Sequence, residues 1–140
     1  MGYLIDTCIW IDVERGLISP SDVAMYTGSD SVYISPVTLA ELGFGVEMAI
    51  SEEIKQKRTS SLERLRKKPL LIIDDGTGII FARLAAVLKR SGRGSSFRVQ
   101  DIWLASQAIQ NNFSFLTKNT KDFEDIRGLK LVVFGESDRL

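Results

Sequence analysis

The residues of this 140-residue chain that could do chemistry are acidic, and four of them stand at or just beyond the ends of apolar runs, or at the start of a helix beside them. They are Asp6, Glu41, Asp101 and Asp122. Carboxylates crowded within a few ångströms cannot all stay ionised unless a cation neutralises them. Oxygen ligands of this kind suit Mg²⁺ or Mn²⁺, and such an ion can orient water for attack on a phosphoryl group. The set therefore predicts metal-dependent phosphodiester hydrolysis, provided that the fold brings the four together.

Each carboxylate taken singly also has a simpler structural role. Asp6 could cap the helix expected to start near Cys8, and Asp101 could complement the dipole of its helix. Asp122 could serve in a turn, and Glu41 could face solvent, although its neighbours are mostly apolar and a buried unpaired carboxylate is costly. Capping and exposure explain the single residues, whereas the metal site explains the set.

Composition removes the main alternatives to carboxylate chemistry. The chain has no histidine and a single cysteine, Cys8, which excludes Ser-His-Asp and Cys-His catalytic units, a His-containing zinc site and an internal disulfide. One cysteine fits a reducing compartment, and we expect a cytoplasmic protein. No stretch reaches the roughly 18 apolar residues that span a bilayer, and the N-terminus does not read as a signal peptide.

The formal net charge of zero hides an uneven distribution along the chain. Residues 1–50 hold seven acids and one base, residues 51–98 hold twelve bases and five acids, and the remainder is nearly balanced. Such asymmetry indicates an acidic site beside a surface for an anionic partner. The alternative is that long charged helices are simply solvated.

Hydrophobic periodicity predicts short strands alternating with helices. The expected strands are residues 3–5, 32–34, 70–73, 113–117 and 130–133, and the expected helices are residues 8–15, 20–27, 36–46, 51–68, 76–90 and 100–110. This alternation indicates crossover units and a parallel sheet. The run at 70–73 is continuously apolar, which is typical of a strand buried on both faces. We expect an α/β fold that forms a single domain over residues 1–140.

Five segments of the chain resemble a known family in their order and spacing. They are LIDT at 4–7, SPVTLAELGFG at 35–45, DIWLA at 101–105, TKNTKDF at 117–123 and GLKL at 128–131. Together they resemble PIN-domain ribonucleases, specifically VapC-type toxins of bacterial or archaeal toxin–antitoxin pairs. The resemblance implies a three-layer α/β/α fold with a central, mainly parallel sheet of four to five strands. It also implies a Mg²⁺- or Mn²⁺-dependent endoribonuclease that acts on structured RNA such as tRNA or rRNA.

The resemblance also assigns roles to individual residues. Asp6, Glu41 and Asp101 match the acidic positions that bind the metal and position water, and Asp122 matches a further catalytic acid. Thr7 matches a residue that supports this site. Asn119 stands where many members carry an acid, so it is a candidate for an outer ligand of the site or a ligand of a second metal.

The expected partners are RNA, a VapB-type antitoxin and a second copy of the chain. Lys55, Arg58, Arg93 and Arg98 are candidates for contacts to the RNA backbone, which position RNA without reading its sequence. Apolar residues at 44–46 and 79–81 are candidates for a homodimer interface, and the antitoxin would add a hetero-oligomer. The loop at 92–98 looks longer than the family's compact form. Two alternatives stay open: a PIN nuclease for RNA processing without an antitoxin, and a degenerate binding module, which Cys8 and Asn119 would indicate.

Overall fold

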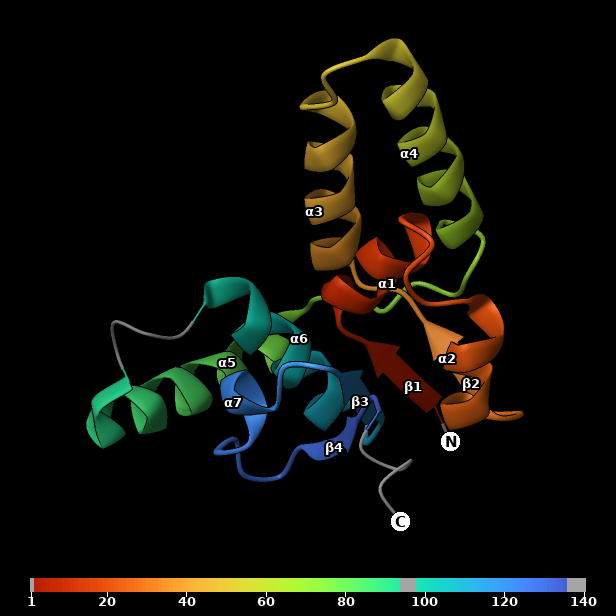
Figure 1. Cartoon of the computed structure of the whole chain (residues 1–140). Helices are drawn as coiled ribbons and strands as arrows, with labels where there is room; N and C mark the ends of the chain where they lie inside the picture. The colour runs from red at the N-terminus through yellow and green to blue at the C-terminus, as the bar shows by residue number, and fades with distance from the viewer. Residues whose placement is uncertain (1, 94–97, 136–140) are drawn as a thin grey trace.

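The computed structural model describes residues 2–93 and 98–135. Within these ranges it contains four strands and seven α-helices (Figure 1), so most of the loop expected at 92–98 lies outside the described residues. No helix in this part of the chain is long and apolar enough to cross a membrane.

All four strands run parallel in one sheet, in the spatial order β2-β1-β3-β4. Their bounds are β1 Gly2–Ile5, β2 Ser31–Tyr33, β3 Ser114–Thr117 and β4 Lys130–Val133. β1 lies in the centre beside β3, with Ile5 opposite Leu116. The parallel arrangement confirms the predicted α/β class and places the ends of β1 and β3 side by side.

Helices follow β1, β2 and β3, and most predicted helices are confirmed within a few residues. Their bounds are α1 Thr7–Glu14, α2 Pro20–Thr27, α3 Pro36–Glu47, α4 Glu52–Leu65, α5 Asp75–Leu88, α6 Val99–Gln110 and α7 Thr120–Phe123, with a short π-type turn, η1 Lys89–Arg93, after α5. Ser19 and Ser35 cap α2 and α3, and each precedes a proline in the first helical turn, where proline's fixed φ is tolerated. α7 was not predicted, because four residues are too few to show a helical period.

The prediction of a strand at residues 70–73 is wrong. Only an isolated bridge links Leu70 to Ile34, and Leu71 N donates to the Ile34 carbonyl. Leu71 is buried, whereas the side chains of Leu70 and Ile72 are 51% and 71% exposed. The segment is therefore an extended connection with one buried residue, and the sheet has four strands among the described residues rather than five.

Alternate residues of the central strands fill two separate cores, one on each face of the sheet. Leu4 and Phe115 pack with residues of α5 and α6, whereas Ile5 and Leu116 pack with residues of α1, α2 and α4. This alternation is the period of two expected for a strand, and it produces three layers. α3 and α4 form a helical pair that projects beyond the sheet (Figure 1).

Candidate active site

Asp6 follows β1 directly and directs its carboxylate across the sheet edge towards β3. It occupies the N-cap position of α1 but accepts no capping hydrogen bond. Thr117 Oγ1, at the end of β3, donates to Asp6 Oδ2 over 2.7 Å, and Cys8 Sγ donates to the same oxygen over 3.3 Å. The Asp6 residue is only 5% exposed. These contacts favour a role for Asp6 in the candidate site over a role as a helix cap.

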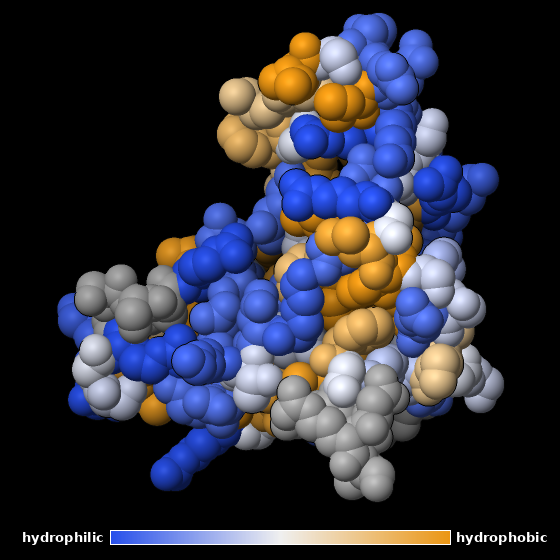
Figure 2. Space-filling view, in the orientation of Figure 1, coloured by the Kyte–Doolittle hydropathy of each residue, from blue (hydrophilic) through white to orange (hydrophobic). Residues whose placement is uncertain are grey.

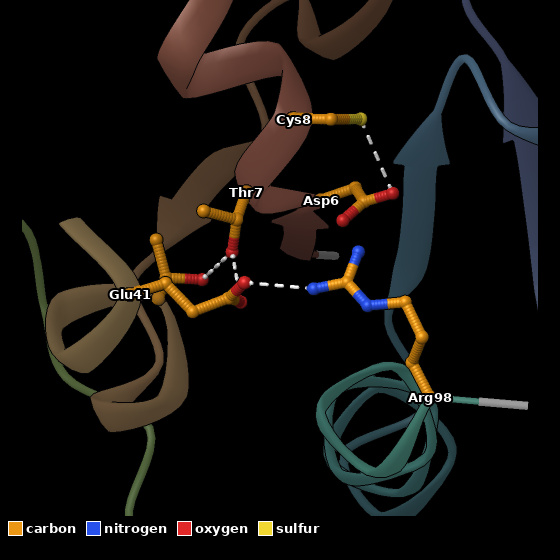
Figure 3. Close-up of polar contacts among 6 residues, drawn as sticks. Asp6, Thr7, Cys8, Glu41 and Arg98 are labelled. Carbon is orange, nitrogen blue, oxygen red and sulfur yellow. Dashed lines mark hydrogen bonds and ion pairs between the residues drawn. The ribbon is translucent and has the colours of Figure 1, made fainter. Parts of the chain in front are cut away.

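A chain of hydroxyl groups holds Glu41 of α3 against the start of α1. Thr7 Oγ1 donates to Glu41 Oε1 over 3.0 Å, and the Thr7 and Thr38 hydroxyls lie 2.9 Å apart. Figure 3 shows these contacts and the direction of the Glu41 carboxylate, which points towards the space in front of Asp6. Glu41 is partly buried, so it is not the solvent-facing residue of the simpler alternative.

Asp101 lies in the first turn of α6, almost fully buried at 5% exposed. Burial raises its pKa from an ordinary 3.8 to about 6, and the negative charge of Asp6 is the next cause. The charges of Asp122 and Glu41 raise this pKa further, against the opposing effect of a nearby arginine. The charges of three other acids thus act on Asp101, as they do when like charges lie near one another. The fold therefore brings the four predicted carboxylates together.

The arginine in question is Arg98, the N-cap residue of α6. Its Nη2 donates to Glu41 Oε2 over 3.1 Å, and the guanidinium points into the space between Glu41 and Asp6 (Figure 3). Partial burial lowers the pKa of Arg98, but the charges of Asp101, Glu41 and Asp6 outweigh that effect and raise it. We call Asp6, Glu41, Asp101 and Asp122 the acidic cluster; Arg98 is the cation within it.

The segment after β3 forms the outer edge of the acidic cluster. Asp122 lies in the first turn of α7, and Asn119 is its N-cap residue without a side-chain capping bond. The Asn119 backbone N–H donates to Thr117 Oγ1 over 3.0 Å, so Thr117 links this segment to Asp6. Lys118 turns away to pair with Asp12 of α1.

The donor chemistry of the acidic cluster fits a hard divalent cation. A carboxylate such as Asp101, whose pKa is raised by burial and by neighbouring acids, gains stability when a cation neutralises the site, and oxygen ligands suit Mg²⁺ and Mn²⁺. Among residues 2–93 and 98–135, no three acidic or cysteine side chains lie close enough together, in their present positions, to share one ion. A cation would therefore draw the carboxylates inwards from the positions that they adopt around Arg98.

The other predicted RNA contacts lie elsewhere. Arg58 of α4 donates to the Gly45 carbonyl over 2.7 Å, and Arg93 pairs with Asp125. Lys55 is exposed on α4. Arg98, by contrast, contacts Glu41 of the acidic cluster.

Sequence reasoning gave no role to Thr38 and Thr117. Both are fully buried and hydrogen-bond within the site. Their signal in the sequence was weak: each is a polar residue within a largely apolar motif, and only the fold shows which carboxylate each one faces.

A groove opens beside Glu41, between α1, α3 and α4. Its apolar wall is formed by Trp10, Leu42, Leu62 and Leu65, and charged residues Glu14, Arg15 and Arg58 also line it. The indole N–H of Trp10 is buried and has no hydrogen-bond partner among residues 2–93 and 98–135. Because Glu41 lines the groove and also belongs to the acidic cluster, the groove runs up to the site.

The sequence and the fold of this chain both have counterparts among known proteins. The PIN domain family matches residues 3–129, and the chain therefore belongs to the PIN domain family. It is 30% identical over 138 residues to Ribonuclease VapC1 of Rickettsia felis, covering 99% of this chain and 100% of that protein. It is 33% identical over 125 residues to Ribonuclease VapC5 of Mycobacterium tuberculosis, covering 89% and 87%.

A solved structure gives the same picture for the fold. VapBC2 from Rickettsia felis, bound to a DNA fragment from its promoter, superposes with a TM-score of 0.80 at 25% identity, covering 96% of this chain and 99% of that chain. The sequence resemblance to VapC-type PIN ribonucleases and the three-layer fold are thus confirmed.

Proposed function

We propose that this protein is the endoribonuclease toxin of a VapBC-type toxin–antitoxin pair, and that residues 1–140 form a single PIN domain. The observation that carries the proposal is the buried Asp101 at the carboxyl edge of the sheet, whose pKa is raised to about 6 by burial and, further, by the charges of Asp6, Asp122 and Glu41. Ribonuclease relatives over nearly the whole chain support the same reaction. The substrate is RNA, with tRNA or rRNA as the expected class.

Asp6, Glu41 and Asp101 would hold Mg²⁺ or Mn²⁺, with Asp122 as a further catalytic acid and Asn119 as an outer or second-metal ligand. A bound divalent ion would supply positive charge to the phosphoryl group and lower the pKa of a water molecule. The chain's own residues set the geometry: Thr117 orients Asp6, and Thr7 orients Glu41. Both hydroxyls fix carboxylates that must otherwise separate because of their like charge.

The expected partners follow from the surfaces beside the site. An antitoxin of the VapB type fits the groove between α1, α3 and α4, because the apolar wall of that groove would be buried by a partner and its far end reaches Glu41. The solved relative from Rickettsia felis is itself a VapBC structure. RNA would approach the open side of the acidic cluster.

A homodimer would use the exposed apolar residues of the helical surface. Of the residues expected there, Phe44 and Ile79 are exposed, whereas Val46 is buried and Phe81 stacks on Trp103 with ring centroids 4.3 Å apart. Phe44 and Ile79 are therefore the better candidates.

The direct test is cleavage of tRNA and rRNA by the purified protein with Mn²⁺ or with EDTA. Asp6→Asn and Asp101→Asn remove one negative charge each from the cluster, and we expect cleavage to fall by about a hundredfold or more, since loss of a group that stabilises transition-state charge costs roughly that much. Glu53→Gln is a matched control on the exposed surface of α4 and should cleave as the wild type does.

Two outcomes would contradict the proposal. Cleavage that persists in EDTA would exclude the metal-dependent mechanism. If the wild-type protein neither cleaves RNA nor binds Mn²⁺ in calorimetry, it is instead the degenerate binding module that Cys8 and Asn119 would indicate.

A further inference from the structure

Both oxygens of the Glu41 carboxylate are already engaged by the chain itself. Thr7 donates to Oε1 over 3.0 Å, and Arg98 donates to Oε2 over 3.1 Å. The Thr7 bond is compatible with a ligand on the other oxygen. The Arg98 bond is not, because the guanidinium occupies the side of Glu41 that faces Asp6 (Figure 3).

Arg98 also interacts with more than one acid. The charges of Asp101 and Asp6, as well as that of Glu41, act on its guanidinium. Two cations cannot take the same lone pairs, and like charges repel. A divalent ion bound by these acids must therefore displace the guanidinium from its present position.

The position of Arg98 in the chain makes such displacement simple. It directly precedes α6, and its side chain contributes no capping hydrogen bond to that helix. The side chain is 57% exposed, so it can rotate into solvent without breaking the core. Asp101 lies three residues further along in the first turn of the same helix and is almost fully buried. The proposed metal ligand Asp101 is therefore held in place, whereas the Arg98 side chain can move away.

We propose that Arg98 sets the metal affinity of the site by occupying the acidic cluster in the metal-free protein as an internal competitor of the divalent cation. This inference rests on the metal site of the proposed function. It also explains why no three of the acids lie close enough together to share one ion among the described residues. The planar guanidinium fork is wider than a single metal ion, so carboxylates arranged around it stand further apart than they would around one ion.

The test is calorimetric titration of the EDTA-treated, dialysed protein with Mn²⁺ in the absence of RNA. Arg98→Gln and Arg98→Ala should both bind Mn²⁺ about threefold to tenfold more tightly than wild type, as expected for release of a partly exposed ion pair. Arg66→Gln, which removes an exposed arginine paired with Glu63, is the control and should bind as wild type. Raising the salt concentration should narrow the difference, since exposed charges are screened.

The outcomes separate this inference from the proposed function. If wild type binds Mn²⁺ and both Arg98 variants bind it equally or more weakly, Arg98 is not a competitor and the inference is wrong, while the metal site stands. Weaker RNA binding by those variants at unchanged Mn²⁺ affinity would assign Arg98 to the RNA backbone instead and also overturns the inference. If neither the wild type nor the variants bind Mn²⁺, the proposed function is wrong and this inference is wrong with it.

Discussion

Thr117 Oγ1 donates a 2.7 Å hydrogen bond to Asp6 Oδ2, which joins the ends of the neighbouring strands β3 and β1. The hydroxyl is fully buried and also accepts from the Asn119 backbone N–H. One side chain thus fixes a cluster carboxylate and the start of the segment that carries Asp122. This link makes Thr117 a positioning residue for two sides of the site.

Thr117→Val keeps the shape of the side chain and removes the hydroxyl. Asp6 then loses its shortest hydrogen bond and keeps the weaker one from Cys8, and a hydrogen bond to a charged group contributes about 1.5–3 kcal/mol. We expect Mn²⁺ affinity to fall roughly tenfold or more, with lower RNA cleavage at subsaturating Mn²⁺ and partial recovery at high Mn²⁺. Calorimetry and cleavage assays over a range of Mn²⁺ concentrations measure both effects.

Thr59→Val is the matched control, because Thr59 is exposed on α4. It should leave Mn²⁺ affinity and cleavage unchanged. Equal Mn²⁺ affinity in Thr117→Val and wild type would contradict a positioning role for the hydroxyl.

The raised pKa of Asp101 predicts an unusual dependence of stability on pH in the metal-free protein. The folded state holds the proton up to about pH 6, whereas the unfolded chain releases it near the ordinary value of 3.8. Stability from this group is therefore fully present below about pH 4 and is lost as the pH rises through about 6. Urea midpoints measured in EDTA across that window should show the loss.

Asp101→Asn is the test of that assignment. The variant carries no titrating group at this position, so the loss of stability between about pH 4 and 6 should be smaller than in wild type, and at pH 7 the metal-free variant should be the more stable of the two. A variant with the same pH dependence as wild type would show that another group is responsible. Greater stability together with lost cleavage would be the trade-off expected of a strained site.

The sequence predicted the acids of the site but not how they are held. Asp6 and Asp101 could be recognised because strand ends and helix starts follow from local periodicity. The hydrogen bond from Thr117 to Asp6 spans 111 positions and the pair of Arg98 with Glu41 spans 57, so neither leaves a local pattern. The contact of Arg98 with RNA stays a prediction, and the basic residue gave no local sign that it pairs with Glu41. The false strand at residues 70–73 has a similar cause, because an apolar run does not reveal which of its side chains the fold will bury.

The homodimer is the remaining prediction, and the end of the projecting helical pair is its best-supported interface. Phe44 is 68% exposed, and Met48 and Ile50 are exposed close by; Figure 2 shows apolar surface at the far end of α3 and α4. Grouped exposed apolar side chains of this kind mark interaction sites.

Phe44→Ser should therefore weaken self-association about tenfold or more, because burying a phenylalanine contributes roughly 1.5–3 kcal/mol. Sedimentation equilibrium of the isolated protein measures the dissociation constant. Ile79→Ser, on α5, removes the other candidate and should leave the dimer unchanged. If instead the dimer survives Phe44→Ser and is lost in Ile79→Ser, the interface lies on α5, and the end of the helical pair is left for a different partner.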